Sequence, residues 1–133
     1  MNLSDYAESQ DKQESGSPYY IEDAYFNVRR VGTPAFHREI EIIKKSLYGF
    51  APKEIDNSLV MAYWLAEYGV TGWGGVLDDN DKELEYSKSN ALKVFLNPAY
   101  LMSLNPILIG HGSDYNNYLF DEVNEDIDQV KKN

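Results

Sequence analysis

Cysteine is absent from this chain of 133 residues. Its absence excludes disulfides, thiolate metal sites and cysteine nucleophiles, and is compatible with a reducing compartment. An excess of basic residues is missing too, because 12 Lys and Arg stand against 22 Asp and Glu, for a net charge of −10. Nucleic-acid backbones and anionic membranes attract basic patches, so we expect the chain to bind neither.

Long apolar runs are also lacking. No segment approaches the roughly 20 apolar residues that cross a bilayer. Residues 1–6 contain neither the basic nor the apolar part of a signal peptide. With 43% hydrophobic residues, the chain can still build one modest core. The composition therefore predicts one soluble, intracellular domain.

Residues 1–18 contain mainly Ser, Gln, Asp and Glu. Such a segment buries too little apolar surface to offset the entropy of ordering, so we expect a flexible acidic arm at 1–18 and a single folded domain at 19–133. The first 23 residues carry half of the net negative charge. The arm is either a solubilising tail or a segment that orders on a partner.

Two amphipathic helices are predicted in the first half of the domain. Residues 19–31 alternate in polarity and favour a strand that Gly32 ends. Thr33 and Pro34 then form a good helix start, and Gly49 a helix end. The second helix is expected to start near Pro52 and to run to Gly69, with a broad apolar face.

Residues 70–87 predict a β-hairpin between helices. Residues 70–77 and 84–87 favour short strands, and the polar run 78–83 favours a turn. The glycines beside Trp73 relieve steric limits on the backbone, so this ring is expected to turn into the core. The strand at 19–31 is a candidate to pair with this hairpin.

The second half of the domain predicts further helices. Ser87 is a candidate cap for a helix that carries Ala91 and Phe95. Pro106 is expected to break or kink a helix over residues 99–109, and residues 110–112 to form a loop. A narrow apolar stripe predicts a last helix from Ser113 onward, on Leu119, Val123, Ile127 and Val130. The predicted class is α+β and mainly α-helical, with about five helices and one β-hairpin.

Signs of catalysis or of a bound cofactor are weak. His37 and His111 lack the surrounding ligands that a metal site needs. The acidic turn lacks the glycine and the spaced glutamate of an EF-hand loop. The glycines at 72–75 lead into a strand, whereas a phosphate-binding loop leads into a helix. We expect no enzyme, no metal and no cofactor. A small hydrolase that uses Asp78 and Asp81 is the remaining enzymatic hypothesis.

Eleven tyrosines are the strongest compositional excess. Several lie near the ends of the predicted domain, where aromatic rings with a polar tip often contact other proteins. The other interpretation is that the rings pack half-buried around a small core. The candidates for partner binding are Tyr115, Tyr118 and Phe120.

The order of these elements resembles the tail assembly chaperones of long-tailed bacteriophages. The resemblance covers residues 20–131 and rests on the segment 23–36, the run Thr71-Gly72-Trp73-Gly74-Gly75-Val76, and the segment 84–92. Each piece is weak alone, and their order and spacing are more specific. The residues that carry the family motif are Arg30, Gly72, Trp73, Gly75, Val76, Tyr86, Ser87 and Asn90.

The resemblance implies a non-enzymatic protein of the host cytoplasm. Such a chaperone binds the tape-measure protein, keeps its apolar helices soluble and recruits tail-tube subunits. Self-association, or a longer form made by ribosomal frameshifting, is also compatible with the family. An acidic small domain suits the shielding of a hydrophobic partner. The alternative is a small structural tail or connector protein of the virion.

Overall fold

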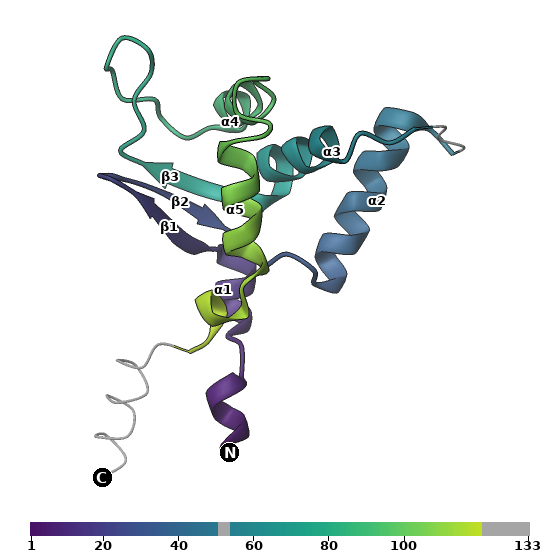
Figure 1. The fold of residues 1–133 in the computed structure, drawn as a ribbon, viewed down its shortest axis with the longest axis vertical. Helices are drawn as coiled ribbons and strands as arrows, with labels where there is room; N and C mark the ends of the chain where they lie inside the picture. Colours follow the sequence, from purple (N-terminus) through teal and green to yellow (C-terminus); the bar gives the residue numbers. More distant parts are fainter. Residues whose placement is uncertain (51–53, 121–133) are drawn as a thin grey trace.

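The computed structural model describes residues 1–50 and 54–120, which form five α-helices and one three-stranded antiparallel sheet (Figure 1). The strands are β1 (Ser17–Ile21), β2 (Ala24–Val28) and β3 (Val70–Gly74), in the spatial order β1-β2-β3. The helices are α1 (Gln10–Ser15), α2 (Pro34–Tyr48), α3 (Asn57–Trp64), α4 (Lys88–Phe95) and α5 (Leu104–Ser113). The predicted α+β, mainly helical class is confirmed, as is the count of about five helices.

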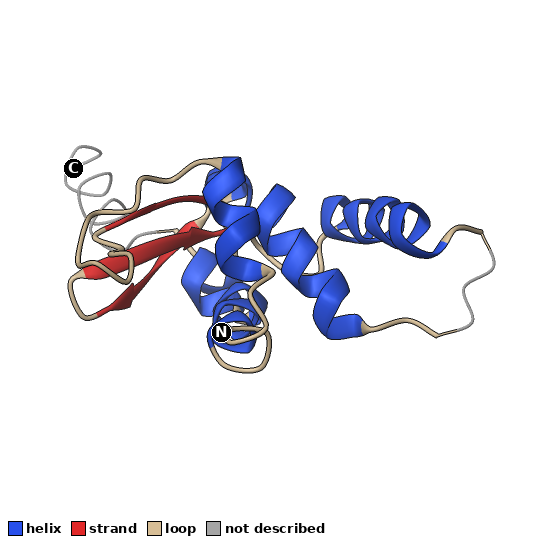
Figure 2. Ribbon diagram, turned by 90° about the horizontal axis from the view of Figure 1, so that it is seen from above, coloured by secondary structure: helices blue, strands red, loops and turns tan. Residues whose placement is uncertain are grey.

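The sheet lies at one side of the molecule and α2 at the other (Figures 1 and 2). Between them, α3 packs against α2, and α5 packs against β1 and β2. Residues 65–69 continue α3 as a π-helical turn, η2 (Leu65–Gly69), which leads directly into β3. The central helices therefore join the sheet to α2.

The segment at 19–31 forms most of a hairpin rather than one strand. The chain reverses at Glu22, whose φ of 54° is unusual for a residue with a side chain, and β1 and β2 pair on either side of this turn. The predicted pairing of this segment with the later strand is confirmed, because Phe26 of β2 lies opposite Trp73 of β3. Phe26 and Trp73 are both buried.

The predicted hairpin at 70–87 is wrong in its second strand. Beyond β3, residues 75–87 form no second strand. They contain an isolated bridge between Leu77 and Glu83, a hydrogen bond from Leu84 N to Val76 O of 2.8 Å, and the bonds of the turn itself. The two predicted strands nevertheless lie close together, because the Trp73 indole Nε1 donates to Leu84 O at 2.7 Å. A side chain of β3 therefore holds the segment that begins at Leu84, in place of a second pair of hydrogen-bonded strands.

Gly75 makes the sharp exit from β3 possible. Its φ is +71°, and a Cβ atom built there would lie 2.6 Å from the backbone oxygen of Asp23. We expect Gly75→Ala to lower the free energy of unfolding by about 1–3 kcal/mol, because it adds backbone strain and a clash. Urea denaturation measures this change. Gly110→Ala is the matched control: apart from the adjoining backbone of its own helix, nothing lies within 4 Å of that Cβ, and alanine is the better helix residue, so a gain is expected.

Local helix signals were predicted correctly. Thr33 Oγ1 accepts from Phe36 N at 3.1 Å and caps α2, and Gly49 follows its last residue with a φ of 73°. Ser87 Oγ accepts from Asn90 N at 3.0 Å and caps α4. The start of α3 was placed too early, because Asp56 is its cap and Asn57 its first residue.

Of the expectations around α5, the interruption of a helix over residues 99–109 is confirmed, and the loop at 110–112 is wrong. Residues 97–103 form turns, and Pro106 is the third residue of α5, where its missing N–H costs no helical bond. Gly110, His111 and Gly112 belong to α5 and not to a loop. A Cβ on Gly112 would lie 2.9 Å from Arg29 O. The glycine therefore permits close contact between α5 and the end of β2.

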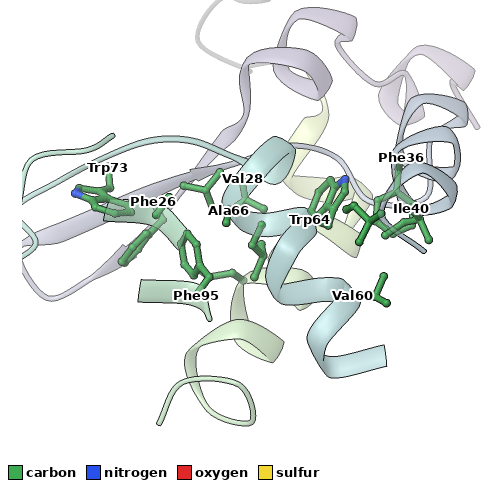
Figure 3. Packing of buried hydrophobic residues seen from close by; sticks show 14 residues of the cluster. Phe26, Val28, Phe36, Ile40, Val60, Trp64, Ala66, Trp73 and Phe95 are labelled. Carbon is green, nitrogen blue, oxygen red and sulfur yellow. The ribbon is translucent and has the colours of Figure 1, made fainter. Parts of the chain in front are cut away.

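Two groups of aromatic rings build the core (Figure 3). Phe26, Trp73 and Phe95 form one group under the sheet, with ring centroids 5.9–6.3 Å apart. Phe36 of α2 and Trp64 of α3 form the other, 4.8 Å apart. The prediction that Trp73 lies in the core is confirmed, and Trp64 is fully buried.

The prediction of a flexible arm at residues 1–18 is wrong. These residues form a 3-10 helix, η1 (Leu3–Tyr6), then α1 and the start of β1. Helix α1 lies beside a second 3-10 helix, η3 (Tyr115–Tyr118), as Figure 1 shows. Ser9 N donates to Tyr118 O at 2.6 Å, and Lys12 Nζ donates to Leu119 O at 2.7 Å. These tertiary bonds order a segment whose composition alone favours disorder.

The predicted last helix is represented by η3 alone within the described residues. Its remaining positions, Val123, Ile127 and Val130, lie outside the described residues. Across 1–50 and 54–120, no helix has the length and apolar content of a membrane span.

Candidate partner-binding site

Trp73 and Tyr86 anchor the segment that follows β3. Their rings meet edge to face with centroids 5.1 Å apart. The Tyr86 hydroxyl donates to Val70 O at 2.9 Å, and burial raises the pKa of this phenol. Both side chains bond the backbone of the opposite segment, so these two motif residues have structural roles.

Other motif residues support the same segment. Asn90 Nδ2 donates to Glu85 O at 2.8 Å, next to the Ser87 cap. Val76 packs half-buried against the core. Gly72 lies in β3 opposite Asn27, and a Cβ there would meet only the Asn27 amide, at 3.8 Å. These contacts hold the segment between β3 and α4 in place.

Arg30 lies elsewhere, at the centre of what we call the Arg30 cluster (Glu8, Arg30, His111 and Tyr118). Its Nε donates to Glu8 Oε1 at 2.7 Å, and its Nη1 donates to the backbone oxygens of Val31 and Gly112, both at 3.0 Å. The guanidinium also lies over the Tyr118 ring, 5.6 Å from its centroid, and the His111 ring lies 6.3 Å from the same ring. The bond to Arg30 lowers the pKa of Glu8. The cluster joins the N-terminal segment to α5 and η3.

Tyr118 was predicted to bind a partner, and this prediction is wrong. Its side chain is fully buried, and its hydroxyl donates to Val28 O at 2.6 Å. Burial raises the pKa of this phenol strongly. Tyr115 and Phe120 are 40% and 52% exposed, so their role in partner binding stays a prediction. The three residues do not form one surface, because the middle one points into the core.

The Arg30 cluster predicts a stability that falls in mild acid. Burial lowers the pKa of His111, against the raising effects of Ser17 and Asp114. The unfolded chain therefore takes up a proton near pH 6.5 before the folded chain does, and stability falls as the pH drops through that range. Protonation of Glu8 adds a further loss only below its ordinary pKa, near 4.5.

We expect the urea midpoint to fall between about pH 7.5 and 5.5, and His111→Gln to reduce this fall. The exposed His37 on α2 provides the control, since His37→Gln should leave the fall intact. An equal fall in the His111→Gln chain would contradict the prediction.

An apolar groove between α3 and α5 is the best candidate for a binding site. It encloses about 220 Å³. Its lining comes from the start of α3, from the turn before α5, and from α5, through Asn57, Ser58, Met61, Leu101, Asn105, Pro106 and Ile109. None of these described residues is ionisable. We call this feature the α3–α5 groove.

A neighbouring apolar side chain extends the surface beside the groove. Met102 is 78% exposed. Ser58 Oγ lies 3.5 Å from the Met102 sulfur, so this methionine is held against α3. Asp56 directs its carboxylate to the amides of Ser58 and Leu59 and caps α3. The groove thus opens onto an apolar, adaptable side chain.

Asn105 is the unusual residue of the groove. It is 2% exposed, and its Nδ2 donates to Phe95 O at 2.9 Å. Its Oδ1 is the single buried side-chain nitrogen or oxygen among the described residues that has no hydrogen-bond partner. Such a group lowers stability unless something satisfies it.

A second cavity, of about 380 Å³, lies beside the acidic turn, and its lining is more polar because it includes Asp78, Asp79 and Lys93. Asp78 Oδ1 accepts from the amides of Asn80 and Lys82, at 2.8 and 3.0 Å, so this carboxylate organises the turn itself. Within residues 1–50 and 54–120, no three His, Asp or Glu side chains lie close enough to hold a metal ion.

The groove was missed from the sequence. Its residues come from three separate segments, and each looks like an ordinary helix or turn residue in its own context. Met61 and Met102 were the available signal, because methionine is common on adaptable binding surfaces. No protein-family model, curated protein or solved structure matched this chain.

Proposed function

We propose that this chain is a tail assembly chaperone of a long-tailed bacteriophage. In this proposal it works without catalysis in the host cytoplasm. It binds apolar helical segments of the tape-measure protein reversibly, keeps them soluble and helps to recruit tail-tube subunits.

The observation that carries the proposal is the α3–α5 groove on a strongly acidic chain. The lining offers apolar contacts and no charge, whereas the whole chain has a net charge of −10. An amphipathic partner helix can bury its apolar face in such a groove. The acidic remainder keeps the complex soluble through repulsion between copies.

The resemblance to this family adds support from other residues. Trp73, Tyr86, Ser87 and Asn90 are the motif positions that fix the segment between β3 and α4. A family motif made of such structural residues is typical of proteins that share a fold and that bind their partners through surface contacts.

Co-expression with the tape-measure protein encoded in the same genome tests the proposal. We expect that protein to be soluble with this chain and to aggregate without it. Pro106→Glu, which places a carboxylate in the groove, should reduce the soluble fraction. Ile42→Glu is the control, because Ile42 is exposed on α2, outside the groove. If the tape-measure protein is equally soluble without this chain, the proposal fails.

Purified phage particles separate the proposal from a structural role in the virion. A chaperone leaves before the tail is complete, so we expect the chain to be absent from particles by mass spectrometry. Its presence there in stoichiometric amounts would favour a small tail or connector protein.

A further inference from the structure

We infer that the α3–α5 groove binds the indole ring of a tryptophan in the partner protein, and that Asn105 Oδ1 accepts the indole N–H. The inference deepens the proposed function by naming the side chain that the groove takes. Its test uses small probes, so it can fail while the proposed function stands.

The first step rests on the amide of Asn105. Its Nδ2 donates one N–H to Phe95 O, and its Oδ1 is buried without a partner. What this side chain lacks is therefore a donor to Oδ1. A ligand that brings a single N–H donor on an apolar body supplies it.

The second step rests on the walls. Met61, Leu101, Pro106 and Ile109 are apolar, and no described lining residue is ionisable. A cationic ligand group would therefore lose its hydration without gaining an opposite charge. About 220 Å³ is less than the usual volume of a pocket for a drug-sized ligand, and suits one large side chain.

Among side chains, tryptophan fits both demands. Its indole is a large apolar body with one N–H donor and no acceptor. A leucine side chain would contact the apolar walls but would leave Asn105 Oδ1 without a hydrogen-bond donor. The hydroxyl of tyrosine, serine or threonine would bring acceptor lone pairs into an apolar site.

Entry of the ring requires a small rearrangement, because Oδ1 is buried in the unbound chain. Met61 lines the groove half-buried, and its unbranched side chain has three rotatable bonds. Rotation of Met61 is therefore the rearrangement that we expect to admit the ring. The thioether then gains a contact with the aromatic ring.

NMR titration of the full-length chain with N-acetyl-L-tryptophanamide tests the inference. We expect shifts of the Asn105 side-chain amide and of the Met61 methyl group. The 1-methylindole analogue and the benzothiophene analogue lack the N–H donor and should bind about 3- to 10-fold more weakly. Equal affinity of all three probes would overturn the inference, as would shifts confined to other residues.

Two further comparisons sharpen this test. Free tryptophan carries charges at its backbone and should bind more weakly than the capped probe; tighter binding of free tryptophan would indicate a metabolite site and overturn the inference. Pro106→Glu should weaken binding at least about fivefold. Its neighbour Ile107→Glu adds the same charge outside the lining and should not. An equal loss in both variants would count against the groove.

Ligand analogues are preferred to substitution of Asn105. Asn105→Leu would leave Phe95 O without its donor and would lower stability for a reason unrelated to the ligand. Removing the donor from the probe leaves the folded chain unchanged, so a loss of affinity is assigned to the N–H group.

Discussion

Trp73→Ala is expected to lower the free energy of unfolding by about 3–5 kcal/mol. The ring is buried among Phe26, Tyr86 and Phe95, and its removal leaves a cavity between the sheet and α4. The substitution also leaves Leu84 O without its indole donor. Urea denaturation followed by circular dichroism measures the change.

Two companion variants separate these causes. Trp73→Phe keeps most of the apolar volume and loses the hydrogen bond, so its cost should be clearly smaller. Tyr20 is 69% exposed at the outer edge of the sheet, and Tyr20→Ala should change stability little. Unchanged stability of Trp73→Ala would place the ring on the surface and make residues 70–87 the leading partner-binding face.

Arg30→Ala is expected to lower the free energy of unfolding by about 2–4 kcal/mol. The substitution leaves the Glu8 carboxylate and the Gly112 carbonyl oxygen without their guanidinium donors. It also removes the cation above the Tyr118 ring. Because the cluster attaches the N-terminal segment, we expect faster amide hydrogen exchange in residues 8–13 as well.

Arg38 provides the matched control for this experiment. It is an exposed arginine on α2, and Arg38→Ala should cost less than about 0.5 kcal/mol. If Arg30→Ala costs no more than this control, the Arg30 cluster does not hold the N-terminal segment.

Features that depend on nearby residues were predictable from the sequence. The caps at Thr33 and Ser87 and the helix end at Gly49 are each decided within one helical turn. The burial of Trp64 and Trp73 follows from their size and apolar neighbours.

Features decided by distant contacts were not predictable. Residues 10–15 have no apolar stripe, and their helix is held by η3 from the other end of the described chain. Two glycines in residues 110–112 favour a loop by propensity, but the packing of Gly112 against Arg29 keeps them in α5. Tyr118 was assigned to the surface from its place near the end of the domain, while its depth depends on Val28, ninety positions earlier.

The candidate site also depends on contacts between distant segments. The sequence pattern points to residues 70–87 and to the aromatic residues near the end of the domain as candidates. In the structure, Trp73, Tyr86 and Tyr118 have structural roles. The α3–α5 groove exists only after α3 and α5 meet, so no single segment of the sequence contains it.

The contact between Glu8 and Leu119 has a consequence for folding during synthesis. The ribosome makes residues 8–13 early, but their partners in η3 emerge about a hundred residues later, which takes several seconds at the usual rates of translation. During that interval Arg30 lacks its partners in α5 and η3, and the site that later holds the Tyr118 ring is empty. Closure of this long loop is therefore a late step, and the sheet and α2 are available to fold before it.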